Sequence, residues 1–98
     1  MKNKGLLQKI DFLLSVAQKQ EYSDKELSQI VELSKEHSDH MILGRFMGYS
    51  VSDYAIATLK WLGYGEAIDK FNTLYNTLSQ TRKQDITRLI DKKVYLQY

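Results

Sequence analysis

Cysteine and proline are absent from this chain of 98 residues, and glycine occurs only five times. Without cysteine, the chain cannot form disulfide bonds, thiolate metal sites or a thiol nucleophile. With so little proline and glycine, it lacks the turn-forming residues that an all-β fold needs between its short strands. These absences favour an all-α fold.

Long uncharged runs are also absent. The longest extends from Phe71 to Thr81 and is largely polar, so we expect no segment to cross a bilayer. The opening residues MKNKG carry the positive charge of a signal-peptide n-region, but Gln8, Lys9 and Asp11 interrupt the apolar run behind them. We therefore expect a cytoplasmic protein.

The overall composition is that of one folded domain covering residues 1–98. Hydrophobic residues make up 43% of the chain and aromatic residues 11%, which is typical of a globular protein. The net charge of only +2 argues against a dedicated nucleic-acid binder. Charge is nevertheless uneven along the chain: residues 23–40 are mainly acidic, whereas residues 82–93 are mainly basic.

The stretch from Asp39 to Leu62 is the one around which the rest is expected to pack. Helical spacing places most of its apolar residues on one broad face, and we expect Leu43, Met47, Tyr54 and Trp61 to be buried. The same spacing confines Arg45, Asp53 and Lys60, with Ser52, to a narrow wet strip. We predict one unbroken helix; the alternative is a break, with Ser50 capping a new helix that starts at Val51.

Four more helices are expected around this one. An apolar stripe predicts the first over residues 3–20, and the capping box Ser23-Asp24-Lys25-Glu26 predicts a second that ends near Glu36. Gly63 is a natural stop for the central helix, and the next is expected from Glu66 to about Leu78. A second capping box, Thr81 to Gln84, predicts a short last helix from Arg82. Together these elements predict an antiparallel four-helix bundle with a short additional C-terminal helix.

Few residues suggest chemistry. The run His37-Ser38-Asp39-His40 offers two metal-capable histidines, but no third and fourth ligands are evident, so a polar cap is the simpler interpretation. There is no G-x-S-x-G motif and no phosphate-binding glycine loop. A helix-turn-helix over residues 54–78 would place Glu66 and Asp69 near phosphate, which is unfavourable. We expect no enzyme activity, cofactor, nucleic acid or small-molecule substrate.

The basic C-terminal segment has two interpretations. It is either a solvated helix face, the usual role of a charge run, or a recognition surface in which basic groups and tyrosines meet an anionic partner. The closing residues Val-Tyr-Leu-Gln-Tyr should either dock on the bundle or contact that partner. The candidate partner-binding residues are Lys83, Arg88, Lys92, Lys93, Tyr95 and Tyr98.

In length, order and character of its segments, the whole chain resembles a known family. The segments are MKNKGLLQKIDFLL, SDKELSQIVEL, MILGRFMGYSVSDYAIATLKWL and TRKQDITRLIDKKVYLQY. The family is that of the immunity proteins of pediocin-like (class IIa) bacteriocins, and the chain most resembles the mundticin and enterocin immunity proteins within it. These are small cytosolic proteins that protect a lactic acid bacterium from its own antimicrobial peptide.

The resemblance implies a non-catalytic four-helix bundle that acts close to the cytoplasmic side of the membrane, partly in peripheral contact with it. Its implied partner is the mannose phosphotransferase permease bound by bacteriocin, and its C-terminal region is associated with choosing the bacteriocin. Carried over by region, that role falls on the six candidate residues named above. The competing hypothesis is a small helical adaptor or regulator that binds another protein through Asn72, Thr73, Asn76 and Thr77.

Overall fold

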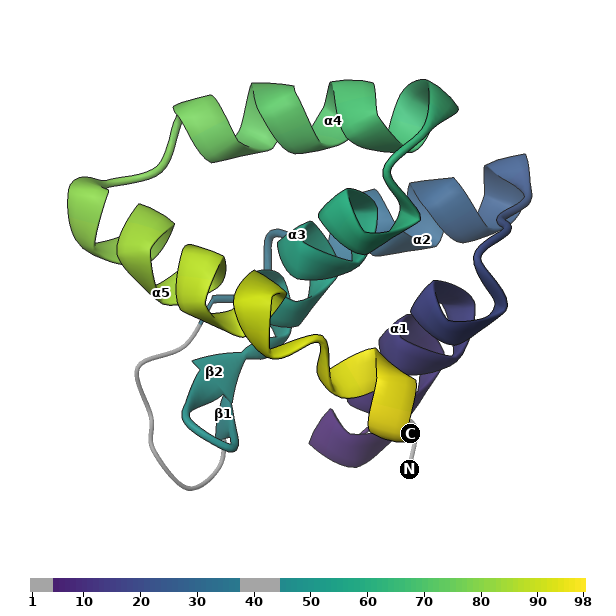
Figure 1. The fold of residues 1–98 in the computed structure, drawn as a ribbon, viewed down its shortest axis with the longest axis horizontal. Coiled ribbons are helices and arrows are strands. Elements are labelled where there is room, and N and C mark those ends of the chain that lie inside the picture. Colours follow the sequence, from purple (N-terminus) through teal and green to yellow (C-terminus); the bar gives the residue numbers. More distant parts are fainter. Residues whose placement is uncertain (1–4, 38–44) are drawn as a thin grey trace.

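The computed structural model describes residues 5–37 and 45–98, and most of these residues are helical. The all-α class is therefore correct, with one small β-hairpin added (Figure 1). In chain order the elements are α1 (Leu6–Lys19), α2 (Asp24–Leu33), β1 (Arg45–Phe46), β2 (Tyr49–Ser50), α3 (Val51–Leu62), α4 (Gly65–Asn76), α5 (Gln80–Lys92) and the 3₁₀ helix η1 (Val94–Gln97).

The predicted capping box at the start of α2 is confirmed. The Ser23 hydroxyl accepts from the Glu26 backbone N–H at 3.1 Å, and the Glu26 carboxylate accepts from the Ser23 N–H at 2.9 Å. Lys19 also donates to Glu26 at 2.7 Å. This lysine and the Ser23 N–H both favour the ionised carboxylate, so the pKa of Glu26 lies below its ordinary value.

The prediction of one unbroken central helix is wrong within the described residues, and the alternative break at Ser50 is confirmed. Residues 45–50 form an antiparallel two-stranded ribbon that pairs Phe46 with Tyr49. Its turn residues, Met47 and Gly48, have φ of 54° and 91°, the positive values that tight hairpin turns require. Residues 39–44 of the predicted helix lie outside the described part.

A second capping box explains why α3 begins where the ribbon ends. The Ser50 hydroxyl accepts from the Asp53 N–H at 3.3 Å, and the Asp53 carboxylate accepts from the Ser50 N–H at 3.0 Å. Gly63 ends the helix with φ of 67°, the left-handed conformation typical of a residue that terminates a helix. Thus α3 has only 12 residues.

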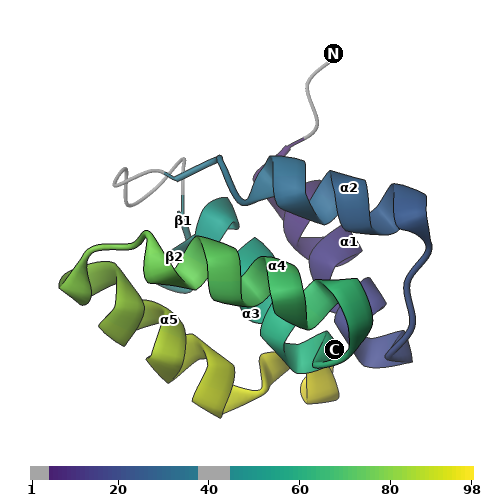
Figure 2. The same ribbon diagram turned by 90° about the horizontal axis from the view of Figure 1, so that it is seen from above.

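This short helix is the centre of the fold. Every residue of α3 except Lys60 is buried, because α1, α2, α4 and α5 all pack against it. Figures 1 and 2 show α1 and α2 on one side of α3, and α4 and α5 on the other. A helix with so little exposed surface is one that other elements enclose on nearly all sides.

Burial of the central stretch is as predicted for two of four residues. Tyr54 and Trp61 are buried, whereas Met47 is 72% exposed because it lies at the tip of the hairpin. Leu43 lies outside the described residues. The predicted wet strip is also wrong: Ser52 and Asp53 are buried, and only Lys60 of its α3 residues is exposed.

The ends of the other helices differ modestly from those predicted. The α2 helix ends at Leu33 rather than near Glu36, and α4 ends at Asn76 rather than Leu78. The predicted capping box at Thr81 is wrong: α5 starts at Gln80, and Ser79 caps it by accepting from the Arg82 N–H at 3.2 Å. Ser79 and Thr81 are both capping residues by type, and the path of the chain from α4 selects the earlier one.

Candidate functional site

The C-terminal segment docks on the helices, one of the two outcomes expected for it. Trp61, near the end of α3, donates from its indole Nε1 to the Ile90 carbonyl at 3.0 Å. The Tyr95 ring packs on the same indole with ring centroids 4.8 Å apart. Lys93, with φ of 48°, ends α5 and turns the chain into η1. The indole therefore joins α3 to both C-terminal elements.

The outer side of the docked segment is exposed and combines apolar with basic groups. Leu96 is 63% exposed and Tyr98 50% exposed, and Lys92 and Lys93 just before them are exposed as well. Leu7 of α1, 64% exposed, adjoins Tyr98 along a shared hollow. We call these five residues the C-terminal patch: Leu7, Lys92, Lys93, Leu96 and Tyr98.

The hollow beside the patch lies between α1, the hairpin and the chain's end. It has a volume of about 630 Å³ and is lined by Leu7, Gln8, Ile10, Asp11, Phe46 and Tyr98. Leu7 and Phe46 were not predicted as site residues. Leu7 lies within the first predicted helix and Phe46 within the predicted central helix, where each is one of several apolar residues. No sequence signal therefore distinguishes either one as a site residue.

The predicted site residues divide into two groups. Lys92, Lys93, Tyr95 and Tyr98 gather at the junction of α5 and η1, where the Lys92 ammonium lies 5.4 Å from the centroid of the Tyr49 ring. Lys83 and Arg88 instead line a separate hollow of about 320 Å³ between α4 and α5. Along the α5 axis, Lys83 and Lys92 are about 13 Å apart. Lys83 is therefore remote from the C-terminal group, whereas Arg88 lies one helical turn, about 6 Å, from Lys92.

Within the second group, both basic side chains have partners nearby. The Lys83 ammonium lies 5.6 Å from the centroid of the Tyr75 ring, and Arg88 forms an ion pair with Asp85 at 2.6 Å. Tyr75 bonds in turn to the hydroxyl of Thr87 at 3.0 Å. Lys83 and the Tyr75–Thr87 bond therefore tie α4 to α5, whereas the ion pair of Arg88 lies within α5.

A buried ionic cluster that the sequence pattern did not indicate lies at the start of α5. The Asp53 carboxylate is 1% exposed and accepts from the Arg82 guanidinium at 2.6 Å, with Arg45 at 3.7 Å. The same guanidinium donates to the Ser52 hydroxyl at 2.9 Å. This cluster joins the start of α3 to the start of α5 and to the hairpin.

Tyr54 occupies a neighbouring buried position. Its hydroxyl donates to the Phe46 carbonyl at 3.0 Å, and its ring contacts those of Phe46 and Tyr49. Burial raises the pKa of this hydroxyl well above its ordinary value, and the nearby Tyr49 and Asp53 raise it further. The hydroxyl therefore remains a donor and holds the hairpin on α3.

Among residues 5–37 and 45–98, no three histidine or acidic side chains are placed to hold a metal ion. His37 instead contacts the Ser50 hydroxyl at 3.1 Å, and the rest of the predicted His37–His40 run lies outside these residues. No helix in the described ranges is long and apolar enough to cross a bilayer. Comparison with protein-family models, curated proteins and solved structures gave no match.

Proposed function

We propose that this chain is an immunity protein that protects a cell from its own pediocin-like bacteriocin by non-catalytic recognition. The observation that carries the proposal is the C-terminal patch, where exposed Leu96 and Tyr98 lie beside exposed Lys92 and Lys93. Aromatic and aliphatic side chains with flanking cations are suited to an apolar partner that lies against an anionic surface.

In this proposal the partner is the bacteriocin-bound mannose phosphotransferase permease, contacted on the cytoplasmic side of the membrane. Lysine ammoniums near an anionic bilayer each contribute about 1 kcal/mol, so Lys92 and Lys93 would add peripheral membrane attraction. Trp61 and Tyr95 hold η1 against α3, so the backbone beneath the patch is held in one position. This supports recognition rather than mere solvation of the segment. An antiparallel arrangement of four helices, as in the family that the chain resembles, is part of the same proposal.

The test is protection of a sensitive host against a panel of pediocin-like peptides. We expect Lys92→Gln/Lys93→Gln to weaken protection while lowering the melting temperature by less than about 4 °C, because Lys92 loses only an exposed cation–π contact of roughly 0.5 kcal/mol. The control is Lys35→Gln/Lys70→Gln, which removes the same charge from an exposed position just after α2 and from one on α4. Undiminished protection by the first variant at matched protein level would contradict the assignment of the patch.

The adaptor hypothesis is favoured by the exposure of Asn72, Thr73, Asn76 and Thr77 on the outer face of α4. However, Thr73 and Thr77 donate their hydroxyls to carbonyls of their own helix, at 3.1 and 2.7 Å. The two threonine hydroxyls can then only accept from a partner, and the asparagine amides are the side-chain donors that remain on this face. In the same protection assay, loss of protection in Asn72→Ala/Asn76→Ala but not in the lysine variant would place the recognition surface on α4, whereas a parent chain that gives no protection would favour the adaptor.

A further inference from the structure

A groove between α1 and α2 lies away from the C-terminal patch and shares no residue with it. Both helices pack on α3, and the space left between them is a pocket of about 300 Å³. Phe12 and Leu33 supply its apolar walls, and both are only partly buried against the core. This volume is at the lower end of the roughly 300–1,000 Å³ typical of small-molecule sites.

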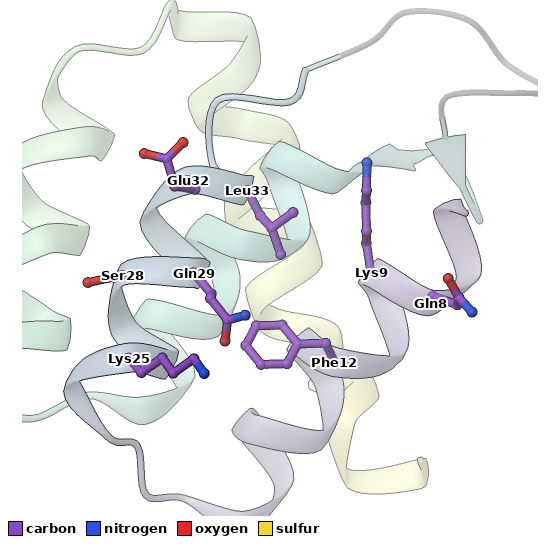
Figure 3. Close-up of a pocket in the computed structure, with 8 residues that line it drawn as sticks. All are labelled: Gln8, Lys9, Phe12, Lys25, Ser28, Gln29, Glu32 and Leu33. Atoms are coloured by element: carbon purple, nitrogen blue, oxygen red, sulfur yellow. The ribbon is translucent and has the colours of Figure 1, made fainter. Parts of the chain in front are cut away.

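Some polar side chains that line the groove point into it, and others point away from it. Figure 3 shows Phe12, Gln29 and Leu33 turned toward one another, with the Lys25 ammonium near the Phe12 ring. In the same view Ser28 and Glu32 point away from the groove. The Gln29 amide and the Lys25 ammonium therefore both face the apolar side chains of the groove.

Of the three charged side chains that line the groove, Lys25 is the one without an ion-pair partner among the described residues. Lys9 forms an ion pair with Glu36 at 2.6 Å, and Glu32 pairs with Lys35 at 3.1 Å. Within the described residues, no acidic group forms an ion pair with Lys25. A ligand that complements the groove would therefore carry one negative charge on an apolar body.

We propose that this groove binds a small amphiphilic carboxylate, such as a medium-chain fatty acid, as a free monomer. Its carboxylate pairs with the Lys25 ammonium and accepts from the Gln29 amide, while its chain lies between Phe12 and Leu33. Charge-assisted hydrogen bonds of this kind are stronger than neutral ones, and the chain removes the exposed apolar walls from water. The pairing selects an acid over the corresponding alcohol or amine.

The test is an amide-shift NMR titration of the full chain with sodium octanoate, below its micelle-forming concentration. We expect saturable shifts at Phe12, Gln29 and Leu33. Lys25→Gln should weaken octanoate binding by about tenfold, the loss of one charge-assisted contact, and should leave binding of 1-octanol unchanged. Phe12→Leu, which keeps an apolar side chain in the core, should weaken both ligands.

Lys35→Gln is the matched control, because Lys35 is exposed just after the end of α2 and lies outside the groove. It should bind octanoate as the parent chain does. The proposal is overturned by an absence of saturable shifts, or by equal octanoate affinity in Lys25→Gln and Lys35→Gln. Shifts confined to the C-terminal patch would also overturn it, since they would report adsorption of an amphiphile to the exposed apolar residues there.

Discussion

Asp53 is the residue whose position most changes the interpretation of this chain. An aspartate in an apolar stretch is expected on a wet strip, yet its side chain is 1% exposed. It is tolerated there because two guanidinium groups and the Ser50 N–H compensate the charge. A buried charge without such partners would cost several kcal/mol.

Removing one of these partners should therefore be costly. We predict that Arg82→Met lowers the free energy of unfolding by about 3 kcal/mol, the low end for a broken buried pair, because Arg45 still lies 3.7 Å from Asp53. Arg88→Met is the control, since its partner Asp85 is 29% exposed and such surface pairs contribute at most about 1 kcal/mol. Urea melts measure both. Equal losses in the two variants would contradict a special role for the buried pair.

At the scale of the element, side-chain caps decide where two of the helices begin. The boxes at Ser23 and Ser50 each give a hydrogen-bond acceptor to two backbone N–H groups at the start of the helix. N–H groups in this first turn have no partner within the helix itself. Both fit the pattern of a serine followed three residues later by an acid. In α5 the cap alone is present, without the reciprocal bond.

We predict that Ser23→Ala lowers the free energy of unfolding by about 1 kcal/mol through loss of the cap. Ser28→Ala, in the exposed middle of the same helix, should have no cost because alanine is the better helix former there. Guanidinium melts at neutral pH compare the two. If Ser23→Ala and the parent chain have the same free energy of unfolding, the Ser23 hydroxyl contributes nothing to the start of α2.

The same box also has a pH dependence with a definite sign. The pKa of Glu26 lies below its ordinary value of 4.5 because Lys19 and the Ser23 N–H favour the charged form. Its contribution to stability is thus complete above pH 4.5 and is lost as the pH falls through the folded-state pKa. Because Glu26 is partly exposed and its partner Lys19 is 50% exposed, solvent screening makes this contribution small.

At the scale of the whole molecule, Trp61 links the central helix to the C-terminal elements. Its indole is 8% exposed, packs on Tyr95 and donates to the Ile90 carbonyl. Deleting it would open a cavity at the junction of three elements and leave that carbonyl without its indole donor. The integrity of the C-terminal patch depends on this junction.

We predict that Trp61→Ala lowers the free energy of unfolding by about 3–5 kcal/mol, the usual cost of removing a buried tryptophan. Tyr98→Ala is the control at an aromatic residue that is 50% exposed, and should cost under about 1 kcal/mol. Thermal melts give both values. In the parent chain the tryptophan emission should be shifted to the blue; a fully water-exposed spectrum in the native state would contradict the packing described.

Local signals in the sequence predicted the all-α class and several helix ends correctly. The Ser23 box and the Gly63 stop act between residues at most four apart, so they can be recognised without knowledge of the fold. A local signal of the same kind, Ser50 as a cap, predicts the alternative helix start at Val51. The unbroken helix was preferred because neither proline nor any other obligatory breaker lies between Asp39 and Leu62, although Met47 and Gly48 proved able to form the hairpin turn.

Contacts between distant residues decided the rest. Asp53 is buried because Arg82, 29 residues away, reaches it from α5, and Trp61 bonds to Ile90 at the same separation. Neither pairing has a spacing that a helical pattern can reveal. The C-terminal patch likewise exists only because Leu7 and Tyr98, at opposite ends of the described chain, line one hollow. Periodicity predicts which face of a helix is apolar, but only the packing of all elements determines which apolar residues are left exposed.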